Sequence, residues 1–460
     1  MTNHRKVSRR LALLPLLVAG FLLFSQFANG ADSAHRVFAH YMVAFATYGE
    51  SLAGYQREIR EAQAAGIDGF ALNVGAWSGP DWYYKTRVRT IYDAAESLGS
   101  GFKLFFSVEL TNTTDIVEMV ATYANRTNTF RHAGKVVLST YGQNQVDWQN
   151  GVFAPLEQSG VSVFFVPFFW PQPVAEIPRY SDAINLLNTY SNLVDGLFLF
   201  GAAGLPSQLA TANADYTRAL KERNRISMAS WTPHYWGMTQ TTIGRRYFES
   251  HGGEGTVLQW ESIIQSQPDW VEIVTWNDFN ESTYVAPVAD PGVHSAHLRT
   301  PRRYPHAGYL ELSKRYIQWF KSGQEPPIDR DLMFYFYRTH RKEAIVPGNA
   351  DAPVSWFIGD VRDQLHVTLL LTAAAELEAT TGGVASTNAV PKGLSHHRVD
   401  FVPGPQKLTL RRNGVSVVAA EGPEILPAIE RYNFIPTSGY AYGPIPGNLS
   451  VPAGVRVRNP

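Results

Sequence analysis

The chain has 460 residues, of which 45% are hydrophobic and 13% aromatic, so it can bury one large core or two ordinary ones and is not a disordered protein. Forty acidic and forty basic residues cancel, which leaves no net field to attract nucleic acid or an anionic membrane surface, and an uncharged partner is expected. Cysteine is absent, so disulfides are excluded.

Residues 1–30 are predicted to be a signal peptide. The basic segment HRKVSRR precedes the apolar stretch LALLPLLVAGFLLF, and Ala28-Asn29-Gly30 provides a cleavage site. An uncleaved membrane anchor is the alternative, although the apolar stretch is shorter than the ~20 residues needed to span a bilayer. We therefore expect a mature chain that begins near Ala31, is secreted to the extracellular space or the periplasm, and makes no membrane contact after cleavage.

Eight apolar, strand-like runs follow within the first 276 residues, and helix-like segments separate them. The runs are RVFAHYM, GIDGFALNV, FKLFFSVEL, KVVLSTY, VSVFFVPFF, VDGLFLF, RISMASW and VEIVTW. Strands that are hydrophobic without alternation are typical of a parallel sheet covered on both faces, and eight strand–helix units predict a (β/α)8 TIM barrel over residues 31–325. A doubly wound sheet is the alternative, and no glycine-rich phosphate loop favours it.

The hydrophobic pattern of the sequence changes after a helix predicted to end at Gly323 and the linker QEPPIDRD. From about Leu332, short alternating runs such as MFYFYRTH and HVTLLLTA are separated by Gly, Pro and Asn turns. This pattern predicts a β-sandwich accessory domain over residues 326–460. The aromatic run from Phe334 to Tyr337 is too apolar to face water, so we expect the sandwich to dock on the barrel.

Polar residues that close the apolar runs are the site candidates, because a barrel assembles its active site at the C-terminal ends of its strands. Asp278 and Glu281, in TWNDFNES, directly follow the eighth run. Two carboxylates among amides and flat aromatic rings suit glycoside hydrolysis, whereas an N-cap or a solvated loop is the alternative. The candidates for substrate binding are His40, Tyr41, Asn73, Trp77, Glu109, Trp170, Trp231, His234, Trp276, Asn277, Asn280 and Tyr284.

Asp68, in GIDGFALN, is a third catalytic candidate, because a buried charge must be paired or functional. An aspartate that caps the turn after the preceding helix is an equal alternative. The 13 histidines form no HExxH or comparable pair, and the sequence contains no EF-hand-like acidic loop, GxSxG elbow or cysteine nucleophile. Neither a metal nor a cofactor is expected.

The order and spacing of these motifs resemble glycoside hydrolase family 71, the α-1,3-glucanases or mutanases, from about residue 36 to residue 345. TWNDFNES is the most specific piece and is similar to the family's TWNDYGES. The resemblance implies a secreted hydrolase that cleaves α-1,3-glucan with inversion, on a (β/α)8 barrel followed by a β-sandwich. Asp278 and Glu281 match the family's catalytic pair, and Asp68 matches a third acidic residue.

Three departures from the family concern the substrate more than the reaction. Glu109 stands where an Asp is usual, Asn280 stands where a Gly is expected, and FGAAGLP follows the sixth run where a Trp-rich loop is common. We expect Glu281 to be the general acid and Asp278 the base, with the reverse order open. An endo-α-mannosidase-like glycosidase and a non-catalytic wall-glucan-binding protein are the alternative functions. The expected molecule is a monomer that acts on a neutral polysaccharide.

Overall fold

The computed structural model describes residues 35–79, 83–237, 244–288, 304–349, 351 and 353–444. The predicted signal peptide lies outside the described residues. From His35 onward the chain forms one compact unit. None of the helices in the described part is both long and apolar enough to cross a membrane.

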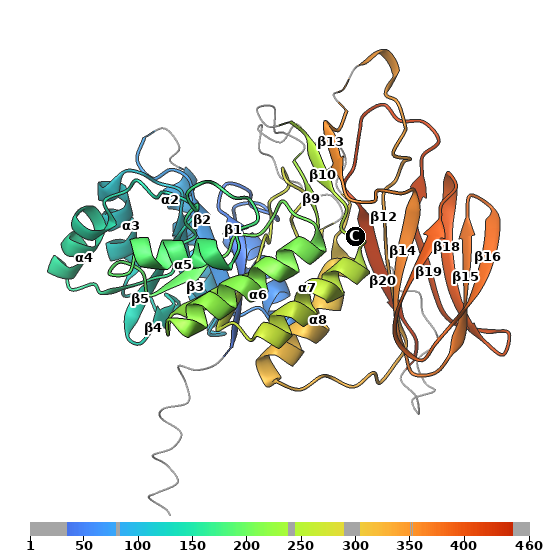
Figure 1. The fold of residues 1–460 in the computed structure, drawn as a ribbon, viewed down its shortest axis with the longest axis horizontal. Helices are drawn as coiled ribbons and strands as arrows, with labels where there is room; N and C mark the ends of the chain where they lie inside the picture. Colours follow the sequence, from blue (N-terminus) through green and yellow to red (C-terminus); the bar gives the residue numbers. More distant parts are fainter. Residues whose placement is uncertain are drawn as a thin grey trace, which may run out of the picture. The chain divides into compact units, whose positions relative to one another are not determined.

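A curled parallel sheet forms the N-terminal part of this unit (Figure 1). Its strand order is β6-β5-β3-β2-β1-β11-β8-β7, and the short β4 (Arg131–His132) adds an antiparallel edge to β5. The two ends of this order meet, because Asp195 N donates to Phe165 O and Phe198 N donates to Pro167 O, both at 2.9 Å. The parallel strands are β1 (Arg36–Met42), β2 (Gly69–Val74), β3 (Lys103–Val108), β5 (Lys135–Thr140), β6 (Val163–Phe165), β7 (Gly196–Phe198), β8 (Ile226–Trp231) and β11 (Trp270–Ile273).

A helix follows each parallel strand, so the mixed α/β alternation predicted from the sequence is confirmed. The first helix begins after Ser51, whose Oγ accepts a hydrogen bond from Gly54 N at 3.1 Å, and the last ends at Gly323 with φ +70°. A π-helix, Trp148–Phe153, leads into the fourth. The helices are α1 (Leu52–Ala64), α2 (Tyr83–Leu98), α3 (Thr113–Tyr123), α4 (Ala154–Gln158), α5 (Tyr180–Thr189), α6 (Pro206–Glu222), α7 (Gly253–Ser266) and α8 (Ala307–Ser322).

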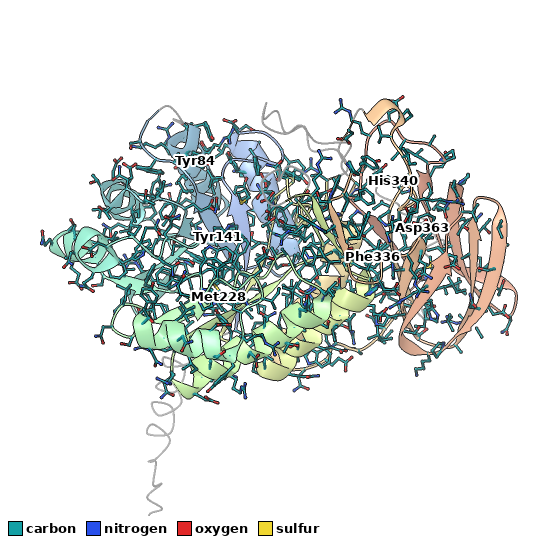
Figure 2. The ribbon with its side chains drawn as sticks, turned by 45° about the horizontal axis from the view of Figure 1, so that its top comes forward. Tyr84, Tyr141, Met228, Phe336, His340 and Asp363 are labelled. Carbon is teal, nitrogen blue, oxygen red and sulfur yellow. The ribbon has the colours of Figure 1, made fainter. Side chains whose placement is uncertain are left out.

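Alternate residues of each parallel strand face two different cores, as the two-residue period of a strand requires. Phe38 packs with Phe105 and Met228 in an inner cluster, which the strands enclose; Figure 2 labels Met228. Val37, Ala39 and Tyr41 belong instead to the outer cluster, which the strands share with the helices. The pleat therefore decides which polar side chains reach the inside of the curled sheet.

Two four-stranded antiparallel sheets, called the C-terminal sheets below, follow α8. One core cluster takes side chains from both sheets, including Leu369 and Leu410, so the sheets pack face to face. Their orders are β17-β14-β12-β20 and β16-β15-β18-β19. The strands are β12 (Leu332–Tyr337), β14 (Gln364–Leu371), β15 (Ala375–Thr381), β16 (Val384–Val390), β17 (Gly393–Asp400), β18 (Gly404–Arg412), β19 (Val415–Ile425) and β20 (Thr437–Tyr442).

The aromatic run of β12 divides between the two parts of the molecule. Met333, Tyr335 and Tyr337 enter the core of the C-terminal sheets, whereas Phe334 and Phe336 join the outer cluster of the parallel sheet. The ring of Phe336, labelled in Figure 2, lies 4.6 Å from that of Tyr309 on α8. Because side chains alternate along β12, one apolar face of this strand packs in each part of the molecule.

A fourth sheet, of three strands, connects the two parts. It consists of β9 (Tyr235–Trp236), β10 (Arg246–Phe248) and β13 (Trp356–Ile358). The first two strands follow β8 and pair antiparallel, and β13 comes from beyond residue 326 and pairs parallel with β10. The sequence pattern placed that segment in the accessory domain alone, and its pairing with β10 was not predicted.

Candidate functional site

Asp278 and Glu281 lie in the loop that follows β11, at the carboxyl end of the parallel sheet. Trp276 N donates to His40 O at 2.7 Å, which anchors this loop to β1. Asn277 strengthens the anchor, because its Oδ1 accepts from Met42 N at 2.7 Å and its Nδ2 donates to Met42 O at 3.1 Å. The predicted site residue Asn277 thus holds the loop in place and is itself fully buried.

The carboxylate of Asp278 is enclosed by its own loop and is only 9% exposed. Its Oδ1 accepts hydrogen bonds from Asn280 N at 2.9 Å and from Glu281 N at 3.1 Å. Burial raises the pKa of Asp278, and these two backbone donors oppose the rise because they favour the charged form. The two backbone donors are therefore in place to stabilise the anion of Asp278 against the effect of burial.

Glu281 has a different environment, although it is only three residues away. Tyr235 Oη donates to Glu281 Oε1 at 3.2 Å. Burial raises the pKa of Glu281 far above its usual value, and the charge of Asp278 is the next largest cause. A carboxyl group in these surroundings stays protonated at a pH where an ordinary glutamate is ionised.

Glu109, which directly follows β3, is the third acidic group at this end of the sheet. Its Oε2 accepts from Asn73 Nδ2, near the end of β2, at 3.1 Å. The negative charge of Glu109 contributes to the raised pKa of both Asp278 and Glu281. The structure thus brings together four of the predicted site residues, namely Asn73, Glu109, Asp278 and Glu281.

Aromatic rings lie beside these carboxylates. The ring of Tyr141, labelled in Figure 2, lies 5.9 Å from that of Trp170 and 4.6 Å from that of Phe200. Phe200 in turn contacts the ring of His40 at 5.1 Å. The pKa of Tyr141 is raised by burial and by the negative charges of Glu281, Glu109 and Asp278, so this ring is close to all three acids. Half-buried Tyr141 and Trp170 offer the flat surfaces on which sugar rings stack.

Three predicted substrate-binding residues point away from this site, into the outer layer. Tyr41 Oη donates to Glu58 Oε1 at 2.9 Å, and Trp276 Nε1 donates to Glu58 Oε2 at 2.8 Å. Trp231 stacks on Trp260 of α7 with ring centroids 5.8 Å apart. Each closes a strand as predicted, but it occupies the position of the pleat that faces the helices.

Three further candidates are also buried. Trp77 is 4% exposed, belongs to the outer cluster and has Lys85 Nζ 5.2 Å above its ring. Tyr284 stacks on His306 at 4.1 Å. His234 lies beside the loop that holds Asp278 and Glu281, where its Nδ1 is 3.2 Å from Ser282 Oγ, and burial lowers its pKa well below the usual value.

Asp68 is not brought to the other acids. It precedes β2, at the amino end of the sheet, whereas Asn73 lies near the carboxyl end of the same strand. Asp68 Oδ2 accepts from Val37 N at 2.9 Å, and Oδ1 pairs with Lys321 Nζ at 2.7 Å. Five residues of extended strand separate the two ends by about 16 Å, so the structure gives Asp68 a place remote from Asp278.

Two buried glutamates were missed in the sequence. Glu272 faces the inside of the sheet from β11, and its Oε1 is 2.7 Å from His40 Nδ1. Glu58 accepts hydrogen bonds from Tyr41, Trp276 and Thr47 N, and burial raises its pKa to about 7. A signal existed for each, since Glu272 is the single charge in VEIV and Glu58 shares the helical stripe of Tyr55 and Ala62.

The arrangement supports proton transfer between a bound molecule and two carboxyl groups with different environments. Asp278 carries backbone donors that stabilise its anion, and Glu281 is kept neutral. Within the described residues, the one cluster with the spacing of metal ligands is Glu249, His251 and His366, which is not part of this site. The site itself therefore has the composition of an acid–base pair with an aromatic wall.

Comparison with known proteins gives a family for this chain. The model of glycosyl hydrolase family 71 matches residues 33–445. The glucan endo-1,3-alpha-glucosidase agn1 of Schizosaccharomyces pombe is 26% identical over 92% of this chain and 98% of its own length. A mutanase of Penicillium rubens is 26% identical over 92% of each chain. A solved endo-alpha-mannosidase of family GH99 from Bacteroides thetaiotaomicron matches at TM-score 0.48 and 13% identity, over 63% of this chain and 99% of that one.

Proposed function

This chain belongs to glycosyl hydrolase family 71 and is a glycoside hydrolase, and from that premise we propose that it cleaves the α-1,3-glucosidic linkages of an α-glucan with inversion of configuration. The names of the relatives support this substrate. The zero net charge of the chain and the rings of Tyr141 and Trp170 suit a neutral polysaccharide. The expected product of the first turnover is the β-anomer.

The contrast between the two carboxyl groups carries the assignment of roles. Glu281, whose pKa is raised most clearly, is the general acid that protonates the glycosidic oxygen as the bond from that oxygen to C1 breaks. Asp278, whose anion accepts two backbone N–H groups, is the base that takes a proton from the water attacking C1. Inversion requires the two carboxyl groups to stand roughly 6.5–9.5 Å apart, with the water between one of them and the sugar.

Substrate hydroxyl groups find partners around this pair. We assign sugar contacts to His40, Asn73, Glu109, Trp170 and Asn280. Asn280 Oδ1 is buried and has no hydrogen-bond partner among the described residues, so a sugar hydroxyl would satisfy it. Tyr41, Trp231 and Trp276 support the site from the outer layer, and Asp68 has a structural role.

The fold in this proposal is a closed (β/α)8 barrel over residues 31–325, with a β-sandwich accessory domain over residues 326–460. The two backbone hydrogen bonds between the β6 and β7 segments and the eight alternating helices support closure. The single core of the C-terminal sheets supports the sandwich. We further propose a monomer secreted after cleavage near Ala31; intact Met1 on exported protein, seen by mass spectrometry, would contradict cleavage.

The reaction is tested with a panel of linkage-defined α-glucans and α-mannans, by measuring released reducing ends. We expect release from α-1,3-glucan, and NMR within minutes of mixing should show the β-anomer first. Early release of the α-anomer would overturn inversion. Activity on mannan alone would favour the mannosidase alternative, and tight glucan binding without release would favour a binding protein.

The roles are tested with an α-1,3-linked glucose oligosaccharide that carries, at its reducing-end anomeric carbon, a leaving group that needs no protonation. Glu281→Gln should lose most activity on glucan and retain much more on this substrate. Asp278→Asn should stay inactive on both, because the attacking water is no longer activated. The opposite pattern would exchange the two roles.

A further inference from the structure

Three potential metal ligands meet where the C-terminal sheets contact the parallel-sheet part. Glu249 and His251 lie in the short segment between β10 and α7, and His366 lies on β14. Each offers one ligand atom, and these atoms all lie within 4.8 Å of one another. The segments are more than a hundred residues apart in sequence, so only the folded chain assembles the cluster.

One ring nitrogen of each histidine in this cluster lacks a hydrogen-bond partner among the described residues. The Nδ1 atoms of His251 and His366 are both buried and have no hydrogen-bond partner among the described residues. Glu249 is 4% exposed, and its Oε1 accepts from His251 N at 2.9 Å. Buried nitrogen atoms without partners are costly, so two of them beside one carboxylate call for a ligand that satisfies all three groups together.

The arginines near the cluster do not balance the negative charge of the Glu249 carboxylate. Three nearby arginines each pair with another acid: Arg338 with Asp363 at 2.9 Å, Arg362 with Asp360 at 2.9 Å, and Arg398 with Glu254 at 2.8 Å. A bound cation would compensate the charge of Glu249.

We propose that Glu249, His251 and His366 bind one divalent transition-metal ion of the zinc type, which fastens β14 to the segment that follows β10. Two imidazoles and one carboxylate are a common ligand set for Zn²⁺, with water as the fourth ligand. Tetrahedral bonds of ~2.0–2.2 Å place ligand atoms about 3.3–3.6 Å apart. His251 Nδ1 and Glu249 Oε1 are 4.0 Å apart, and all the ligand atoms lie within 4.8 Å of one another, so contractions of about 0.4 to 1.5 Å complete the site.

The site would act on architecture and not on the acid–base chemistry. Glu249 directly follows β10, in which Phe248 pairs with Tyr235 of β9. The side chain of His251, 26% exposed, gives the ion a route to solvent. Metal binding would therefore stabilise the junction between the two parts of the molecule.

The proposal is tested on untagged, full-length protein, stripped with a chelator and titrated with Zn²⁺ against a chromophoric competitor. We expect one tight equivalent per chain, and a rise in melting temperature of about 5 °C or more at saturating Zn²⁺. His366→Ala should abolish both. Glu249→Gln, which keeps the acceptor for His251 N, should weaken binding at least about tenfold. His397→Ala, on neighbouring β17, is the matched control and should behave like wild type.

Substitution with Co²⁺ gives a readout that does not depend on folding stability. Tetrahedral Co²⁺ bound by His and Glu should give a visible absorption band in wild type and in His397→Ala, and none in His366→Ala. The proposal is overturned if wild type binds no stoichiometric metal, or if His366→Ala and Glu249→Gln bind Zn²⁺ as tightly as wild type does.

Discussion

The two ends of the parallel sheet both carry acidic residues, but they use them in different ways. At the amino end, three aspartates stand directly before strands, and each accepts a backbone N–H of the neighbouring strand. Asp68 Oδ2 accepts from Val37 N at 2.9 Å, Asp195 Oδ2 from Phe165 N at 2.8 Å, and Asp269 Oδ2 from Ser227 N at 2.8 Å. These carboxylates align the starts of adjacent strands.

At the carboxyl end, Asp278 and Glu281 lie close to another acid, Glu109, whose charge contributes to the raised pKa of both. Burial and mutual repulsion raise the pKa of Asp278 and of Glu281. Like charges held together destabilise the folded chain, so under the proposed mechanism this end sacrifices stability for chemistry. With the roles proposed above, a carboxylate's position along the strand, more than its burial, separates a structural from a reactive acid.

The largest effect should come from exchanging one acid at each end for its amide. We expect Asp278→Asn to lower turnover on α-1,3-glucan by about 10²- to 10⁴-fold, because general base assistance is lost while the shape is kept. Asp68→Asn, assayed per folded molecule, should stay within about threefold of wild type. Initial rates of reducing-end release measure both.

Glu281→Gln should match Asp278→Asn on the same glucan. Circular dichroism and binding to insoluble glucan serve as controls, and both should be unchanged. Full activity in Asp278→Asn, or a hundredfold loss in Asp68→Asn, would remove the distinction between the two ends.

The amino end should show its importance in stability. Asp269→Ala deprives both Ser227 N and Ser227 Oγ of their acceptor, at 2.8 and 2.9 Å. Leaving buried donors unsatisfied should lower the free energy of unfolding by about 1–3 kcal/mol, measured by urea denaturation. Turnover below the melting transition should be unchanged, and Asp195→Ala should behave in the same way. A drop in turnover without a drop in stability would contradict this assignment.

A smaller shift should appear in the pH profile of Glu109→Gln. The negative charge of Glu109 raises the pKa of Glu281, so its removal lets Glu281 lose its proton at lower pH. The general acid must be protonated, and activity is therefore lost as pH rises through this pKa. The alkaline limb of kcat/KM should move down by up to about one pH unit. The amide oxygen of the introduced glutamine can still accept from Asn73 Nδ2, which preserves the local geometry. An alkaline limb that moves up, or stays fixed, would show that Glu281 is not the acid.

The smallest effect should come from Lys321→Gln, which removes the ion pair of Asp68. The two side chains are 32% and 17% exposed, so water and salt screen the pair and its loss should cost about 0.2–1 kcal/mol. A double-mutant cycle with Asp68→Asn, by urea denaturation at low and high salt, isolates the pair. A cost several times larger would mean that the amino end depends on this charge more than on the backbone hydrogen bonds.

Much of this fold can be predicted from the sequence, and the wrong assignments of strand-end residues have one cause. The alternation of apolar runs with helical stripes predicted the mixed α/β fold, which is confirmed, and residues that close the runs included Glu109 and the acidic loop. The same rule also selected Tyr41, Trp231 and Trp276, because it considered only whether a residue ends a strand. It did not consider which face of the sheet the side chain points to. One residue of register turns a side chain from the inside of the sheet to the helix layer.

Glu58 and β13 were missed for a different reason. The partners of Glu58 are Tyr41 and Trp276, and Trp276 is more than two hundred residues away, so only the assembled fold makes a buried glutamate tolerable on α1. The segment of β13 has no strong strand pattern of its own, and its pairing with β10 is set by tertiary contacts. Asp68 was ambiguous because burial alone does not tell a strand-aligning carboxylate from a reactive one.

The pairing of β13 with β10 limits how this protein can be modified by exchanging parts. β13 belongs to the C-terminal half of the chain, β10 pairs with β9, and Tyr235 of β9 donates to Glu281. A chimera joined at the linker near residue 326 would replace a strand two positions away from the strand whose Tyr235 donates to Glu281. The C-terminal sheets are therefore not an interchangeable module, and a graft that retains activity would have to carry residues 356–358 with the parallel-sheet part.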